Sequence, residues 1–149
     1  PLRTPKDVEA LKQGLKDGTI EVISTDHAPH SAEEKTGSMK NTPFGIVGLE
    51  TSLPLTYTEL VEKGVITLKQ MVEKMCLNPA KILGLESGTL QEGHPADVII
   101  VDTEQEYTID KNKFVSKGHN TPFDGWKVKG KVLYTICDGK IIFENQEEK

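Results

Sequence analysis

The 149-residue sequence is poor in cysteine, carries no excess of positive charge and lacks any long apolar run. Its two cysteines, Cys76 and Cys137, form no C-x-x-C pair, so two reduced cytosolic thiols are a better interpretation than a disulfide or a zinc knuckle. The net charge is −5 and there is no basic stripe, which argues against nucleic acid as a partner. No stretch approaches the roughly 18 apolar residues of a membrane helix, and no signal peptide is visible. We therefore expect a cytoplasmic protein that binds neither nucleic acid nor membranes.

The sequence also lacks an initiator methionine, internal repeats and low-complexity linkers. It begins with Pro1-Leu2-Arg3, and helix signals follow at once, as if the chain were entered partway through. Its length and its hydrophobic share of 36% suit one domain with a modest core.

The N-terminal residues predict a helix followed by a strand. Thr4 can cap a helix that has Pro5 at its first position and Asp7 in its first turn. Asp17-Gly18 ends that helix. The apolar, β-branched stretch Ile20–Ser24 then predicts a buried strand of a covered parallel sheet.

Residues 28–50 form a long loop, and such a loop in a compact domain is more often functional than idle. Its first part is polar, and we interpret Glu33-Glu34-Lys35 as a solvated face. Its second part contains Pro43, Gly45 and Gly48, which predict a fixed backbone rather than a regular element.

Helix signals continue to about residue 85. Residues 51–63 form one predicted helix, and Thr67 with Gln70 makes a capping box for the next. Asn78-Pro79 opens a short helix that ends at Gly84.

After Ser87 the pattern changes from helical to strand periodicity. Asp97–Asp102 is a predicted strand, and Thr108-Ile109 is expected to pair nearby. Lys131–Cys137 and Lys140–Glu144 flank Asp138-Gly139, a strong signal for a two-residue hairpin turn. The predicted division of the chain is therefore an αβ part, residues 1–86, and a β part, residues 87–149.

Asp26 is the first candidate for chemistry because it follows the predicted buried strand. It can cap the next turn, or act as a metal ligand or general base. Its place at a strand tip beside a long Gly/Pro loop favours the second interpretation.

The flanking histidines have different expected roles. Pro29 prevents a helical i, i+4 pair of His27 and His30 on one face. We expect His27 to be a packed or hydrogen-bonded imidazole, whereas His30 can meet an anionic substrate. Phe44-Gly45 can offer backbone N–H and C=O groups to a small polar ligand.

Several stretches together resemble bacterial dihydroorotase of the long-chain (class I) type, in the amidohydrolase superfamily. They are Thr25-Asp26-His27-Ala28-Pro29-His30, Pro43-Phe44-Gly45 with Gly48-Leu49-Glu50, Asn78-Pro79-Ala80-Lys81, Gly93…Ala96-Asp97, Asn120-Thr121-Pro122-Phe123 and the initial Pro1-Leu2-Arg3. The resemblance runs over essentially the whole chain.

The resemblance implies an α/β fold class: the C-terminal portion of a (β/α)₈ TIM-type barrel plus the C-terminal strands of a small β-sandwich. Residues 1–86 would supply the last barrel strand and its helices, with the active-site loop 28–50, and residues 87–149 the sandwich strands. The implied reaction is the zinc-dependent, reversible interconversion of dihydroorotate and N-carbamoyl-L-aspartate in pyrimidine biosynthesis.

The resemblance also implies the roles of individual residues. Asp26 would be a metal ligand and the proton shuttle between metal-bound water and the amide nitrogen. His30 would hold the substrate carboxylate, and Phe44 and Gly45 would contact the pyrimidine ring through their backbone. A catalytic zinc usually needs three protein ligands. The implied one or two zinc ions find one recognisable ligand here, so we expect this segment alone to be inactive.

Other interpretations stay open at this point. A related hydantoinase, allantoinase or dihydropyrimidinase would act on an uncharged ring, for which His30 is not needed. A non-catalytic homologue could serve as a scaffold for aspartate carbamoyltransferase, although Asp26 and His30 argue against it. A plain β-sandwich binding module would leave Asp26 and the long loop unexplained. A homodimer is compatible with each of these interpretations.

Overall fold

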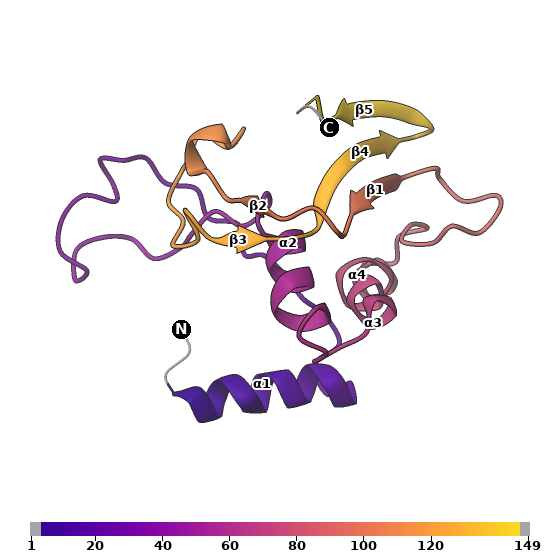
Figure 1. Cartoon of the computed structure of the whole chain (residues 1–149), viewed down its shortest axis with the longest axis horizontal. Helices are drawn as coiled ribbons and strands as arrows, with labels where there is room; N and C mark the ends of the chain where they lie inside the picture. The colour runs from indigo at the N-terminus through magenta and orange to yellow at the C-terminus, as the bar shows by residue number, and fades with distance from the viewer. Residues whose placement is uncertain (1–3, 147–149) are drawn as a thin grey trace.

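The computed structural model describes residues 4–146, with helices in the first part of the chain and strands in the last (Figure 1). Helix α1 (Pro5–Asp17) lies along one side, and the irregular loop that follows it extends away from the helices (Figure 1). None of the described helices has the length and apolar character needed to cross a membrane.

Helix α1 begins and ends as its sequence predicts. The Thr4 side chain accepts the Asp7 N–H, and the Asp7 carboxylate accepts the Thr4 N–H, so a complete capping box closes the first turn. Gly18 follows the helix with φ +90°, in the left-handed region that ends many helices.

The predicted strand at Ile20–Ser24 is wrong for the described chain. The segment has no strand partner within residues 4–146, and the Ile23 N–H donates to the Lys74 carbonyl oxygen (3.0 Å). Strand structure depends on the ladder of a neighbouring strand, and here bonds to helical residues take its place: the Lys74 ammonium donates to the Ile20 carbonyl and the Asn78 amide to the Glu21 carbonyl. Ile20, Val22 and Ile23 are half-buried rather than buried.

The helices after the loop contain short π-helical turns. Helix α2 (Ser52–Thr56) runs on into the π-helical turn Tyr57–Val61, and α3 (Leu68–Val72) into Glu73–Leu77, which joins α4 (Asn78–Leu83). The three predicted helices are thereby confirmed, including the capping box at Thr67 and the left-handed Gly84 that ends α4.

The strands form two small antiparallel sheets. The larger has the order β1-β4-β5, from Val98–Asp102, Lys131–Cys137 and Lys140–Glu144. The smaller pairs β2 (Tyr107–Thr108) with β3 (Lys127–Val128).

The predicted hairpin is confirmed residue for residue. Asp138 (φ +48°) and Gly139 (φ +72°) both lie in the left-handed region, as a two-residue turn between twisted strands requires.

The small core lies where β3 and the loop meet the helices. The Lys129 N–H donates to the Thr58 hydroxyl (2.9 Å). A Cβ at Gly130, between β3 and β4, would come within 3.2 Å of Leu53, so this glycine permits the connection to approach α2. The buried apolar residues are Val47, Ile66, Met71, Ala80, Ile109 and Val128.

The larger sheet keeps much of its apolar surface exposed. Ile141 is 62% exposed and Ile142 65% exposed, although both lie within β5. The described chain is therefore a mixed α/β arrangement in which the predicted barrel strand belongs to neither sheet.

Candidate functional site

Asp26 lies on strained backbone at the start of the site. Its φ is +44°, which is uncommon for any residue other than glycine and is tolerated best by Asn and Asp. The residue is exposed, and within residues 4–146 its carboxylate has no hydrogen-bond partner. The carboxylate is thus open to a ligand, rather than capping the next turn.

His27 is a hydrogen-bonded imidazole, as expected. Its Nδ1 accepts the N–H of Gly48 (3.1 Å) and, more weakly, that of Leu49 (3.4 Å). Because Nδ1 is an acceptor, the neutral ring carries its proton on Nε2. Gly48 is close to Thr25, and a Cβ there would lie 3.1 Å from the Thr25 carbonyl oxygen. His27 therefore fastens the far end of the loop beside Asp26.

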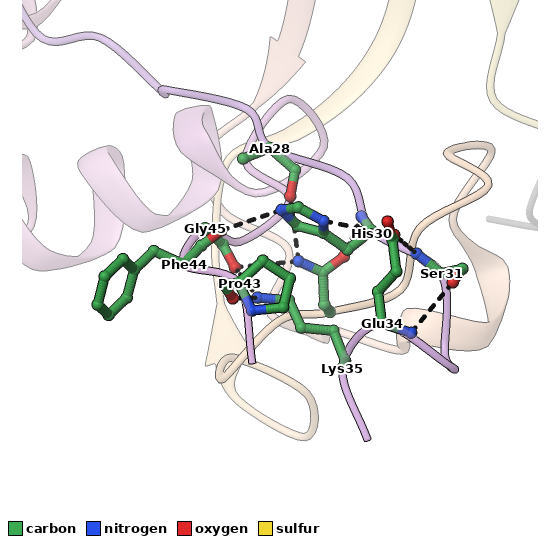
Figure 2. Close-up of polar contacts among 9 residues, drawn as sticks. Ala28, His30, Ser31, Glu34, Lys35, Pro43, Phe44 and Gly45 are labelled. Atoms are coloured by element: carbon green, nitrogen blue, oxygen red, sulfur yellow. Dashed lines mark hydrogen bonds and ion pairs between the residues drawn. The ribbon is translucent and has the colours of Figure 1, made fainter. Parts of the chain in front are cut away.

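His30 faces two acceptors of the loop, one at each ring nitrogen (Figure 2). Its Nε2 donates to the Phe44 carbonyl oxygen (3.0 Å). Its Nδ1 lies 3.4 Å from a carboxylate oxygen of Glu34. Each ring nitrogen of His30 therefore lies near an oxygen that can accept a hydrogen bond. His30 thus already faces a carboxylate, although one from its own loop.

Glu34 is fixed by reciprocal bonds with Ser31. The Ser31 N–H donates to the Glu34 carboxylate (2.9 Å), and the Glu34 N–H donates to the Ser31 hydroxyl (3.2 Å). The Ser31 N–H, with a smaller contribution from His30, holds the pKa of Glu34 below its ordinary value of 4.5. The carboxylate beside His30 is therefore charged at neutral pH.

Phe44 and Gly45 turn their backbone, and not a side chain, toward His30. The Phe44 ring is 91% exposed and points away from the polar cluster (Figure 2). Gly45 has φ +112°, and a Cβ there would lie 2.5 Å from the Ala28 Cβ, so no other residue fits without a shift. In the described part of the chain, neither the Phe44 N–H nor the Gly45 N–H has an acceptor.

Two residues that sequence reasoning gave no role complete the cluster. The interpretation of Lys35 as part of a solvated face is wrong, because its ammonium donates to the carbonyl oxygens of Pro43 and Gly45 (2.7 Å each). The Asn120 amide donates to the carbonyl oxygens of Ala28 and Gly45 (3.1 Å each).

Asn120 also receives a bond from the site. Its side-chain oxygen accepts the His30 N–H (3.1 Å), and its main-chain carbonyl accepts the Val47 N–H (3.0 Å). Asn120 begins the motif Asn120-Thr121-Pro122-Phe123, which marks it as notable but does not indicate what it touches. Lys35 gives no comparable signal, since a lysine in a charged run resembles any surface lysine.

The structure thus joins His30, Phe44 and Gly45 in one cluster and leaves Asp26 open beside it. A hollow of about 1320 Å³ is lined by His27 and Glu50 and by none of these four residues. The cluster is therefore not part of that hollow.

The donor atoms near Asp26 meet only part of the needs of a metal ion. No group of three or more His, Cys, Asp or Glu side chains among the described residues could hold one. The exposed Asp26 carboxylate can supply one oxygen ligand. A catalytic zinc needs further ligands from outside this cluster.

Comparisons with known proteins agree on one family. The sequence pattern described as the amidohydrolase family matches residues 2–142, which include every candidate residue named above. The chain is 53% identical over 142 residues to a dihydroorotase of Acetivibrio thermocellus, with 95% of this chain and 33% of that protein covered. It is also 53% identical over 146 residues to a dihydroorotase of Bacillus cytotoxicus, with 98% of this chain and 34% of that protein covered.

Solved structures give a similar result. An L-hydantoinase (dihydropyrimidinase) from Arthrobacter aurescens superposes with a TM-score of 0.92 at 36% identity, over 99% of this chain and 34% of that one. A dihydropyrimidinase from Brevibacillus agri superposes with a TM-score of 0.90 at 27% identity, over 99% and 33%. The chain spans about a third of the length of these relatives.

Proposed function

The chain belongs to the amidohydrolase family, and on that premise we propose that it supplies the C-terminal part of a dihydroorotase. The proposed reaction is the reversible hydrolysis of dihydroorotate to N-carbamoyl-L-aspartate. The observation that carries this proposal is the 53% identity to dihydroorotases along nearly the whole chain. The His30 ring, which already lies beside a carboxylate, supports a substrate of that charge.

Asp26 has the proposed catalytic role. One oxygen of its carboxylate would bind the catalytic zinc, and the other would carry a proton to the amide nitrogen that leaves. Zinc, when bound, supplies Lewis-acid polarisation of the amide carbonyl. The support from the structure is that the Asp26 carboxylate is exposed and has no partner within the described residues.

His30 is proposed to bind the substrate carboxylate. An imidazolium with its Nε2 anchored on the Phe44 carbonyl has one remaining donor, at Nδ1. Glu34 lies at that donor at 3.4 Å, which is long for a charge-assisted bond. A substrate carboxylate that exchanges with Glu34 would therefore replace one anion by another.

Phe44 and Gly45 are proposed to recognise the ring. A dihydropyrimidine offers carbonyl oxygens and N–H groups, which pair with main-chain groups. The N–H groups of Phe44 and Gly45 are donors of the required kind, and neither has an acceptor among the described residues.

The second candidate is a related cyclic amidohydrolase that acts on hydantoins or dihydropyrimidines. The superposition on an L-hydantoinase favours it, at 36% identity. The higher identity to dihydroorotases favours the first candidate. The ring carboxylate separates the two, because an uncharged ring offers no carboxylate for His30 to bind.

The wider organisation follows from the same premise. We propose that residues 1–86 belong to the metal-dependent barrel and residues 87–149 to a β-sandwich. The homodimer, the cytoplasmic location and the aspartate carbamoyltransferase partner stay predictions of the sequence. Sedimentation of the intact protein with and without the transferase tests the two assemblies.

The direct test is hydrolysis of dihydroorotate and of hydantoin by the intact protein with zinc, with its zinc content measured in parallel. Asp26→Asn should lose at least about a thousandfold in kcat, since the general base and a metal ligand are both lost. Glu33→Gln, an exposed acid in the same loop, is the matched control. If the protein hydrolyses hydantoin but not dihydroorotate, the second candidate is correct. If Asp26→Asn keeps full activity, Asp26 has no part in the mechanism.

A further inference from the structure

We propose that Lys35 is a positioning residue for substrate binding. Its ammonium group holds the carbonyls of Pro43 and Gly45, so that the backbone between them presents its N–H groups to the substrate. The inference rests on the proposed function, since it concerns the same backbone groups.

The geometry around Lys35 is that of a bridge. Its Nζ lies 2.7 Å from the Pro43 oxygen and 2.7 Å from the Gly45 oxygen, eight and ten residues further along the chain. The side chain reaches across the loop to these two oxygens (Figure 2). An ammonium group is a point donor with three hydrogens, and it satisfies two carbonyls only if both face the same side.

The direction of these carbonyls sets the direction of the N–H groups. In a trans peptide the C=O and the following N–H point in opposite directions. The Pro43 carbonyl faces Lys35, so the Phe44 N–H faces away from it. The Phe44 carbonyl faces His30, so the Gly45 N–H faces away from His30. Lys35 therefore orients the Phe44 N–H and His30 orients the Gly45 N–H, the two donors proposed to bind the substrate ring.

Asn120 holds the same segment from the distant part of the chain. Its amide shares the Gly45 carbonyl with Lys35, and it joins that carbonyl to the Ala28 carbonyl and the His30 N–H. The segment is thus held by Lys35 and His30 from its own loop and by Asn120, which lies 75 positions from Gly45. Loss of Lys35 alone should consequently loosen the segment without unfolding it.

Holding the Lys35 ammonium in one place also costs conformational entropy, which a lysine side chain that moves freely at the surface does not lose. A lysine gives up much of its rotamer freedom when its ammonium is held at one place. Lys40, in the same loop, is exposed and serves as the comparison.

The test compares Lys35→Met, Lys35→Arg and Lys40→Met in the intact protein. Methionine keeps the length and apolar stem of lysine but has no donor, and arginine keeps a cation with several donors. Three quantities are measured: amide hydrogen exchange of residues 41–48 without ligand, the Kd of N-carbamoyl-L-aspartate, and KM and kcat for dihydroorotate.

Lys35→Met should speed exchange of residues 41–48 and raise Kd and KM about tenfold, with kcat changed less than about twofold. The reason is that ring contacts made in both ground state and transition state contribute to KM rather than kcat. Lys35→Arg should recover most of the lost affinity, and Lys40→Met should match the unaltered protein.

Each other result overturns the inference in a recognisable way. Faster exchange with unchanged Kd and KM would show that the bridge is structural only. Unchanged exchange would show that Lys35 does not hold the segment. Failure of the unaltered protein to bind or hydrolyse either compound would instead overturn the proposed function, and the positioning role with it.

Discussion

The loop around the candidate site and the C-terminal hairpin are both held by hydrogen bonds, but these come from different sources. In the hairpin, β4 and β5 pair through main-chain groups across a turn of two residues, Asp138 and Gly139. In the loop, side chains of Lys35, His30 and Asn120 hold main-chain carbonyls, and no strand forms. The hairpin is therefore encoded locally, whereas the loop depends on groups distant in sequence.

The two regions also differ in what they leave exposed. In the hairpin, β4 is paired on both sides, whereas β5 forms the edge of the sheet and exposes apolar side chains such as Ile141 and Ile142. The loop exposes Asp26, and it leaves the N–H groups of Phe44 and Gly45 without acceptors among the described residues. The sheet edge thus presents mainly apolar side chains, whereas the loop keeps polar groups available for a ligand.

Of the substitutions that compare the loop with the hairpin, Gly45→Ala has the largest expected effect. A Cβ there would lie 2.5 Å from the Ala28 Cβ, and φ is +112°, so the backbone of the loop must shift. A shift of this kind in a binding segment costs about a hundredfold in kcat/KM. The kinetics of dihydroorotate hydrolysis by the intact protein measure it.

Gly37→Ala is the matched control, since Gly37 lies in the same loop with φ +128° but has only the Thr42 hydroxyl nearby, at 3.8 Å. It should bear a strain of about 1–3 kcal/mol and keep its KM. Equal losses of activity in the two variants would mean that strain, and not the close approach to Ala28, is responsible.

Asn120→Ala should have the second largest effect. It removes the bonds to Ala28, His30 and Gly45 and leaves partly buried groups without partners. We expect a loss of about 1–3 kcal/mol in the free energy of unfolding and of about tenfold in kcat/KM. Asn41→Ala, at an exposed loop position, should change neither quantity. If Asn120→Ala behaved like Asn41→Ala, the loop would not depend on the distant residue.

Gly139→Ala tests the other side of the comparison. Gly139 has φ +72° and open space around it, so alanine there would strain the backbone without a steric clash. The expected loss in the free energy of unfolding is about 1 kcal/mol. The melting temperature should fall while KM and kcat stay unchanged. Asp138→Asn, which keeps a residue tolerant of left-handed backbone, should leave both unchanged. A change in KM would show that hairpin and site are coupled.

The smallest effect concerns pH. The pKa of Glu34 is lowered on folding, so its bonds contribute stability above pH 4.5 that is lost as pH falls through the lowered pKa. Amide exchange of residues 31–35, corrected for intrinsic rates, should speed up below pH 4.5. In Glu34→Gln this pH dependence should disappear. The same acceleration in that variant would assign it to another group.

The correct predictions concern elements whose causes lie within a few residues. Thr4 with Asp7 caps α1, and Asp138-Gly139 turns the hairpin, because both signals act through adjacent backbone. The failed strand at Ile20–Ser24 has the opposite character. Its apolar pattern is typical of a strand, but a strand also requires a neighbouring strand, and the described residues do not place one there.

The site shows the same division. Glycine and proline near Phe44 indicate a fixed backbone from the sequence alone. The partner atoms that fix it could not be predicted, since Lys35 and Asn120 converge on one carbonyl from sequence separations of 10 and 75. A sequence pattern indicates which backbone is unusual, and only the fold reveals which side chain holds it.

At Asp26, the left-handed backbone lowers the stability of the fold, while the side chain is needed for the proposed reaction. Glycine would relieve the strain of φ +44° and should make the folded protein more stable, by up to about 1 kcal/mol. The same change would remove the exposed carboxylate on which the proposed reaction depends. A selection for thermal stability alone would therefore favour Asp26→Gly, and the variant would be more stable but would lack the proposed activity.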